Sequence, residues 1–163
     1  MNKRGADVAA LLLRLIVGAV FIPHGYTKIF GAGGVASFAA DLPNFGIPSF
    51  LGYIAAYAEF YGAILLIIGL LTRLDAFLLA CTMAVAVLVV QLPDAFRGAA
   101  VGASRVFEIM KAIELPLSLF GGTAVLVLIG PGRFSVDAAV RLEQRLLKKK
   151  TAAEAAAVAS SEL

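Results

Sequence analysis

Long uninterrupted runs of hydrophobic residues dominate the chain, and short polar segments separate them. Four of these runs are long enough to cross the hydrocarbon core of a bilayer, which takes about 20 residues of α-helix. They predict transmembrane helices over residues 8–30, 48–71, 74–92 and 113–130. The pattern therefore predicts an all-α fold, an integral membrane four-helix bundle.

Turn and capping residues predict where the spans begin and end. Pro48 suits the first turn of a helix, and residues 72–75, Thr-Arg-Leu-Asp, have the pattern of a capping box that opens the third span. A Leu-Pro pair at residues 92–93 and Gly-Pro-Gly at residues 130–132 predict the ends of the third and fourth spans. The longest loop is therefore expected over residues 93–112.

Two shorter helices are expected outside the four spans. Residues 33–41 predict a short interfacial helix after the first span, and residues 135–150 predict a capped amphipathic helix with a basic face. From Thr151 onward the Ala- and Ser-rich end predicts a frayed tail. The expected division is a membrane domain over residues 1–137 and a cytoplasmic helix and tail over residues 138–163.

Composition agrees with a membrane location. The 163 residues are 61% hydrophobic and only 15% charged, whereas soluble domains are about 25% charged. The net charge of +3 does not indicate nucleic-acid binding, because the basic residues flank the apolar runs. The first run lacks the cleavage site of a signal peptide, so we interpret it as a span.

The distribution of Lys and Arg predicts the orientation of the spans. Ten of these residues fall on the side of the two termini and four on the other side. Because cytoplasmic loops carry an excess of Lys and Arg, both termini are expected in the cytoplasm. The four on the other side are Lys28, Arg97, Arg105 and Lys111.

Cysteine and histidine are too few for most metal centres. With Cys81 and His24 as the only residues of their types, the chain cannot form an internal disulfide, an iron–sulfur cluster or bis-histidine haem ligation. The residue types present would still allow haem to be ligated by His24 together with Met83 or Met110. We expect no haem, iron–sulfur cluster or structural metal.

Two charged residues lie inside the predicted spans. Arg14 is within two turns of the cytoplasmic end, so its long side chain is expected to snorkel to the surface. Glu59 lies eleven residues beyond Pro48, roughly 16 Å along the helix, and cannot reach either surface. Its carboxyl group must therefore be protonated, paired or lining a wet cavity.

Partners for Glu59 are available on the other three spans. His24 and Lys28 are one turn apart and share a helix face, and Gln91 and Glu114 lie at the same side of the membrane. Together these residues predict a polar pocket that opens toward the outer face. The plainer alternatives are a packing role for His24 and interfacial positions for Lys28 and Glu114.

Two further features border this pocket. Tyr57 belongs to a stripe with Tyr53 and Tyr61, and its phenol could donate a hydrogen bond into the pocket or simply pack. Pro23 removes a helical donor one residue before His24, so a kink is expected there.

An ordered series of motifs resembles the DoxX family of small bacterial membrane proteins with four spans. Residues 14–28 resemble its R-x-x-x-G…HG-x-x-K opening, and residues 59–62 its E-x-x-G element. Residues 69–73 are similar to its G-L-x-T-R loop, and Glu114 followed by residues 130–137 to its closing G-P-G-R-x-S-x-D.

The resemblance implies a location in the bacterial cytoplasmic (inner) membrane and a link to redox chemistry. The family takes its name from membrane subunits associated with thiosulfate:quinone oxidoreduction, and other members look like partners of redox or detoxification enzymes. One position departs from the family, since Gln91 stands where members often have histidine. Because an amide is not a basic group like imidazole, we expect neither a proton relay nor a metal ligand at this position.

Our first hypothesis is a membrane subunit of a redox system that binds a quinone or a similar small molecule. His24 and Glu59 would relay protons as the catalytic residues, while Lys28, Glu114, Gln91 and Tyr57 would bind the substrate. The electrons would come from a partner subunit or a bound organic cofactor. Whether the chain is itself an enzyme stays open.

Two other classes of function remain possible from the sequence. A non-enzymatic anchoring or assembly subunit would use the polar cluster only to fix helix register. A small transporter would bind a substrate or a proton at Glu59. In each case the partners expected are the lipid bilayer and either another protein subunit or further copies of the chain.

Overall fold

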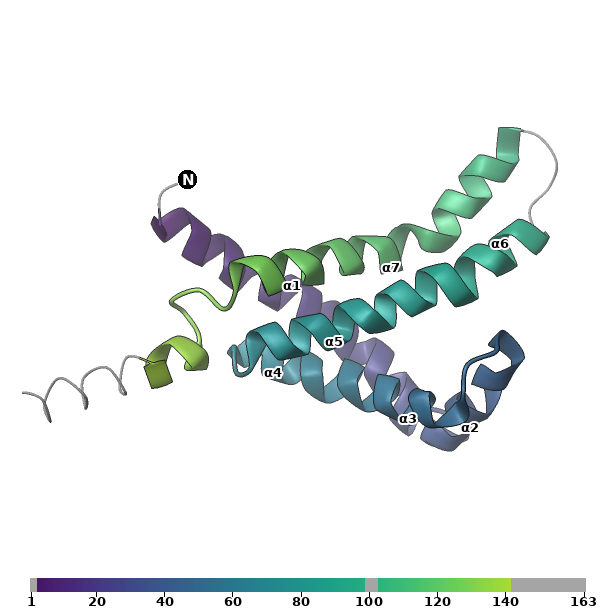
Figure 1. Ribbon diagram of the computed structural model, residues 1–163, viewed down its shortest axis with the longest axis horizontal. Coiled ribbons are helices and arrows are strands. Elements are labelled where there is room, and N and C mark those ends of the chain that lie inside the picture. Colours follow the sequence, from purple (N-terminus) through teal and green to yellow (C-terminus); the bar gives the residue numbers. More distant parts are fainter. Residues whose placement is uncertain (1–2, 99–102, 142–163) are drawn as a thin grey trace, which may run out of the picture.

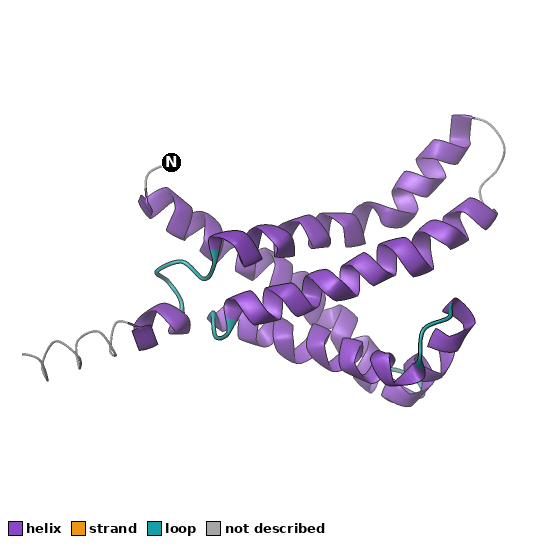
Figure 2. Cartoon of the chain, viewed as in Figure 1, coloured by secondary structure: helices purple, strands orange, loops and turns teal. Residues whose placement is uncertain are grey.

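Helices form all the regular structure in the residues that the computed structural model describes, which are 3–98 and 103–141 (Figure 2). Within them, four stretches are long and apolar enough to cross a membrane: Arg4–Phe30, Ser49–Ile68, Thr72–Arg97 and Arg105–Ile129. The predicted all-α fold with four apolar spans is confirmed. Figure 1 shows the long helices packed side by side, with the short helices at the ends.

The first half of the chain forms two spans joined by a short helical segment. The first span is α1 (Lys3–Phe30), and α2 (Gly34–Asp41) occupies the residues where a short helix was expected. A 3₁₀ turn, η1 (Leu42–Phe45), follows α2. The second span then runs without a break through three elements: α3 (Ser49–Tyr57), the π-helical segment η2 (Ala58–Gly62) and α4 (Ala63–Ile68).

The third and fourth spans are longer than the sequence predicted. The third contains α5 (Thr72–Val85), the π-helical segment η3 (Ala86–Gln91) and α6 (Leu92–Gly98), and the fourth is α7 (Ala103–Ile129). The predicted helix end at residues 92–93 is therefore wrong. Because η3 directly precedes α6, Pro93 falls in the first turn of a new α-helical segment, where proline is tolerated. The long loop expected over residues 93–112 is wrong for the same reason.

The start of α5 is capped from a distant part of the chain. The Asp137 carboxylate accepts hydrogen bonds from the backbone amides of Leu71 and Thr72, each 2.9 Å long. Leu71 has a left-handed backbone, with φ of 52°, and no side chain of the predicted capping box caps the helix. The capping-box prediction for residues 72–75 is wrong, because a carboxylate some 65 positions away takes the capping role.

Arg14 does not snorkel to the surface. Its side chain is fully buried, and its Nη2 donates a hydrogen bond to the backbone carbonyl of Phe134. Gly69, with φ of +75°, leaves room for this guanidinium where a Cβ atom would collide with it. The prediction failed because the segment that follows α7 folds back over the end of α1 and covers Arg14.

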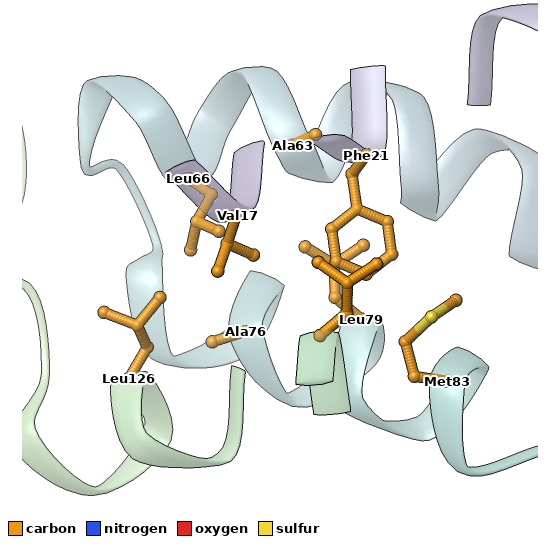
Figure 3. Packing of buried hydrophobic residues seen from close by; sticks show 9 residues of the cluster. Val17, Phe21, Ala63, Leu66, Ala76, Leu79, Met83 and Leu126 are labelled. Carbon is orange, nitrogen blue, oxygen red and sulfur yellow. The ribbon is translucent and has the colours of Figure 1, made fainter. Parts of the chain in front are cut away.

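Apolar side chains from all four spans form the core between the helices (Figure 3). Phe21, Leu66, Leu79 and Leu126 are fully buried there, and each comes from a different span. The outer surface is also apolar, with residues such as Leu128 left 77% exposed. Soluble proteins do not expose apolar area on this scale, so lipid must cover it.

The two described chain ends lie at the same end of the bundle. Figure 1 shows the beginning of α1 and the helical residues 136–141 together on the left, with α2 and α6 on the right. The Arg133 amide donates a 3.0 Å hydrogen bond to the Asp7 carboxylate, which joins the two ends. The Ser135 hydroxyl accepts from the Ala138 amide as a helix cap. The rest of the predicted C-terminal helix and tail lies outside the described residues.

Candidate functional site

The carboxylate of Glu59 is buried and paired with Lys28. Lys28 Nζ lies 2.6 Å from Glu59 Oε1 and 2.5 Å from Oε2, while the Glu59 side chain is only 2% exposed. Lys28 is 25% exposed, and its Nζ also lies 4.8 Å from the centre of the Phe38 ring in α2. The sequence left three possibilities for the Glu59 carboxyl group: protonated, paired or lining a wet cavity. In the structure it is paired with Lys28 and lines a cavity.

Close backbone packing brings α1 to η2 at this point. Gly25 is buried one turn before Lys28, and a Cβ atom built on it would lie 2.5 Å from the backbone nitrogen of Phe60. Only glycine permits this separation between the two spans. The close approach sets the distance over which Lys28 reaches Glu59.

Four polar side chains gather around one cavity of about 190 Å³. His24 and Lys28 come from α1, Glu59 from η2 and Gln91 from η3. The remaining wall is apolar and is supplied by Phe21, Met83, Ala86, Leu115, Pro116 and Leu119. The cavity thus combines a few hydrogen-bonding groups with an apolar lining, as small-molecule sites do.

Each of the four spans contains either a proline or a π-helical segment beside this cavity. Pro23 lies inside α1 next to His24, and Pro116 lies inside α7 in the cavity wall, and both helices continue past these prolines. Glu59 lies within η2, and Gln91 is the last residue of η3. π-Helical turns are rare and are concentrated at functional sites. Two prolines and two π-helical segments therefore lie at the same level of the bundle, beside the cavity.

Among the described residues, the Gln91 side chain has a buried hydrogen-bonding atom without a partner at the cavity. Gln91 Oε1 is buried and has no partner within residues 3–98 and 103–141. A buried acceptor without a partner is costly, so a ligand or water is expected to donate to it. His24 lines the cavity and is also exposed at the surface of the bundle.

Tyr57 and Glu114 lie outside the cavity lining, unlike the other four predicted site residues. The Tyr57 side chain is 43% exposed, and its ring stacks on Tyr61 at a centroid distance of 6.1 Å. Glu114 is also exposed, although Leu115 and Pro116 beside it reach the cavity. Helix rotation explains the difference, because a change of one residue turns a side chain by about 100°.

Sequence reasoning missed two residues that shape the site. Pro116 could have been found, because a proline inside an apolar span signals a local break in the helix, as Pro23 does. Gly25 belongs to a sequence motif, but its contact with Phe60 depends on how the spans pack, which the motif does not predict. Within the described residues, no group of three or more His, Cys, Asp or Glu side chains could hold a metal ion.

The fold and the cavity define a multi-pass, all-α membrane protein with a buried ion pair among its spans. The DoxX family model matches residues 9–92. These residues include His24, Lys28, Glu59 and Gln91, all the polar side chains of the cavity. The chain belongs to the DoxX family.

Relatives in three bacteria are similar to this chain. It is 38% identical to "Putative oxidoreductase CatD" of Bacillus subtilis over 60% of this chain and 70% of that protein. It is 30% identical to the inner membrane protein YqjF of Escherichia coli, over 91% of this chain and 98% of that protein. Membrane protein Rv3486 of Mycobacterium tuberculosis is 29% identical over 88% and 85% of the two chains. No solved structure matches the chain.

Proposed function

We propose that this protein is a membrane subunit of a redox system and that its cavity binds the headgroup of a quinone or a similar small carbonyl compound. The observation that carries the proposal is the Lys28–Glu59 ion pair, buried in a cavity that His24 and Gln91 also line. Buried ion pairs contribute little net stability, so stability alone is a weak reason to keep one. The relative named as an oxidoreductase, CatD, supports the redox assignment.

The size and lining of the cavity fit a small headgroup. A volume of about 190 Å³ is below the roughly 300–1,000 Å³ of sites for drug-sized ligands. It could hold on the order of six waters at about 30 Å³ each. A single flat ring would fill it, with Phe21, Met83 and Leu119 against the ring faces.

The cavity offers both hydrogen-bond donors and hydrogen-bond acceptors, which suits a carbonyl compound that is reduced to an alcohol. Lys28 has three N–H donors, and its two contacts with Glu59 leave one for a ligand oxygen. Gln91 Oε1 can accept from a hydroxyl group. A bound quinone takes up two electrons and two protons to become the quinol. A partner subunit or an organic cofactor would supply the electrons.

The proton route would run through His24 and Glu59. His24 is exposed as well as cavity-lining, so it can take a proton from outside and pass it inward. Glu59, held by Lys28, can accept and release a proton within the cavity. Both residues act here as proton carriers, and Lys28 and Gln91 orient the ligand.

For the cellular setting we infer the bacterial cytoplasmic membrane, with both termini in the cytoplasm. The inner membrane location of the YqjF relative supports the first point. The excess of Lys and Arg at the end that carries the termini supports the second. The cavity would then open in the outer half of the bilayer.

The proposal is tested by measuring the quinone that purifies with the protein from bacterial membranes in mild detergent. Wild-type protein should retain quinone, and Glu59→Gln and His24→Ala should lose most of it. Glu114→Gln is the matched control, because it removes an exposed carboxylate outside the cavity. The hydrogen bond from the Thr27 hydroxyl goes to the backbone carbonyl of His24, which His24→Ala keeps, so this variant should fold normally.

Unchanged quinone content in both Glu59→Gln and His24→Ala would overturn the proposal. If a stable complex with another protein also survives Glu59→Gln, the result would favour the alternative of an anchoring subunit. In that case the ion pair would serve to fix α1 against η2.

A further inference from the structure

Three arginines surround a hollow at the end of the bundle opposite the polar cavity. Arg73 lies in the first turn of α5, Arg133 follows α7, and Arg141 lies in the helical residues 136–141. They line one hollow of about 650 Å³. Neither the family match nor the relatives assign a role to this hollow.

No acidic side chain lines the hollow among the described residues. The Asp137 carboxylate is nearby and its charge interacts with that of Arg141, but its two oxygens accept hydrogen bonds from the amides of Leu71 and Thr72 and it does not line the hollow. The ion pairs within residues 3–98 and 103–141 involve none of the three arginines. Three like charges around one space repel each other unless an anion joins them.

Backbone contacts hold two of the guanidinium groups in place. Arg73 Nη2 donates to the Leu128 carbonyl at 3.4 Å, and Arg141 Nε donates to the Asp137 carbonyl at 3.1 Å. Gly130, with φ of +79°, has no Cβ to push Arg73 away. Each guanidinium retains further N–H donors, because arginine has five.

The hollow lies at the ends of the third and fourth spans, where the boundary between hydrocarbon and water is expected. Arg73 is the second residue of the third span, and Arg133 follows the fourth span by four positions. Ile129, Pro131 and Ala139 form an apolar part of the wall. Phe134 beside it is 58% exposed, as expected of a residue that enters the lipid boundary. A small soluble anion would gain nothing from contact with this apolar wall. A phospholipid carries a phosphate next to its acyl chains, so it can contact both the arginines and the apolar wall.

We infer that Arg73, Arg133 and Arg141 bind the phosphate of an anionic membrane lipid. The guanidinium groups supply planar pairs of N–H donors that match phosphate oxygens. The apolar wall supplies a surface for the glycerol and the upper acyl chain. The site is separate from the polar cavity and does not depend on the function proposed for that cavity.

The test is a lipid titration of the purified full-length protein in neutral detergent, followed by native mass spectrometry. The probes are phosphatidylglycerol, phosphatidylcholine and inorganic phosphate. We expect phosphatidylglycerol to bind more tightly than phosphatidylcholine, and inorganic phosphate not to displace it at millimolar concentration. Arg73→Gln and Arg133→Gln should each weaken phosphatidylglycerol binding about tenfold, the effect of losing one charge-assisted contact.

Arg4→Gln is the matched control. Arg4 is exposed at the same end of the bundle and outside the hollow, so its loss removes the same charge without touching the site. Its effect on binding should stay within about twofold. Arg133→Gln should fold even if Arg73→Gln does not, because the hydrogen bond from Arg133 to Asp7 comes from its backbone amide, which the substitution keeps.

Two results would overturn the inference. The first is equal weakening by Arg4→Gln and Arg133→Gln, which would mean general attraction to charge. The second is binding of phosphatidylcholine, or displacement by inorganic phosphate, at the same concentration as phosphatidylglycerol. The second result would assign the hollow to any phosphate group rather than to an anionic lipid.

Discussion

Lys28 and Glu59 show how a few polar residues can be accommodated inside an apolar bundle. A carboxylate that is 2% exposed would be very costly alone, and the ammonium group within 2.6 Å makes its charge tolerable. Phe38 adds a favourable contact with the cation from α2. The pair therefore depends on three separate segments, α1, α2 and η2.

Removing one member of the pair should destabilise the protein more than removing both. Lys28→Met leaves the Glu59 carboxylate buried without a partner, which should lower the free energy of unfolding by on the order of 3 kcal/mol. The double variant Lys28→Met/Glu59→Leu should recover most of that loss. Thermal unfolding in detergent measures both. A double variant that loses the sum of the two single losses would contradict this account.

Single site residues could be predicted from the sequence where burying their charge inside a span carries a high energetic cost. Glu59, His24 and Lys28 could be grouped from the sequence, because a carboxylate at mid-span needs a partner and the other two share a helix face. The sequence does not show that Tyr57 and Glu114 lie outside the cavity that the other three residues line. Which face of a span turns inward is decided by packing between spans, and both residues are exposed outside the cavity.

At the scale of elements, the hydrophobic runs predicted the spans but not their internal irregularities. The runs end near Gly31, Gly69 and Gly130, where the helices do end. Nothing in the composition of residues 58–62 or 86–91 indicates π-helical turns. The helix through Pro93 was missed because proline falls in the first turn of α6, directly after η3, and the cap of α5 by Asp137 was missed because it depends on tertiary structure.

Gly25→Ala should separate α1 from η2. The added Cβ would lie 2.5 Å from the Phe60 nitrogen, which is backbone and cannot rotate away. We expect a loss of stability of about 1–3 kcal/mol, typical of overpacking, and a parallel loss of any ligand held by Lys28. Gly121→Ala is the control, since its Cβ would meet no atom within 4 Å. Equal effects of the two changes in thermal unfolding would disprove the role given to Gly25.

The Asp137 cap should make α5 sensitive to acid. Burial alone would raise the pKa of Asp137, but hydrogen bonds from Thr72 and Leu71 and the charge of Arg141 outweigh it and lower the pKa below its usual value. A lowered pKa stabilises the folded state above the unfolded pKa of about 3.9, and this stability is lost as pH falls through the folded value.

Asp137→Asn tests this cap. At pH 7 the variant should be less stable than wild type by on the order of 1 kcal/mol, as for other lost N-caps. The difference in melting temperature should shrink as the pH is lowered through about 4 and below. A difference that stays constant from pH 7 to pH 3 would show that the charge of Asp137 does not matter.

In the whole molecule, an apolar core separates two polar regions. Arg14 and the arginine hollow lie toward the end with the termini, and the cavity with Glu59 lies toward the other end. His24 is ten residues beyond Arg14, roughly 15 Å along α1. Val17 and Phe21 between them are buried in the core. The two regions can therefore act independently at different levels of the bundle.

Reporter fusions test the orientation that we infer. Green fluorescent protein fused after Leu163 should fluoresce in a bacterial host, and alkaline phosphatase at the same position should be inactive, because phosphatase folds only outside the cytoplasm. Phosphatase inserted between α6 and α7, over residues 99–102, should be active. The reverse pattern would place the cavity in the inner half of the membrane.

The most direct test of the central claim is an experimental density map of the purified protein in detergent with a quinone added. We predict density for a flat ring in the cavity, with one oxygen within about 3 Å of Lys28 Nζ and the ring against Phe21 and Leu119. A cavity that contains only water, while quinone binds elsewhere or not at all, would contradict the account.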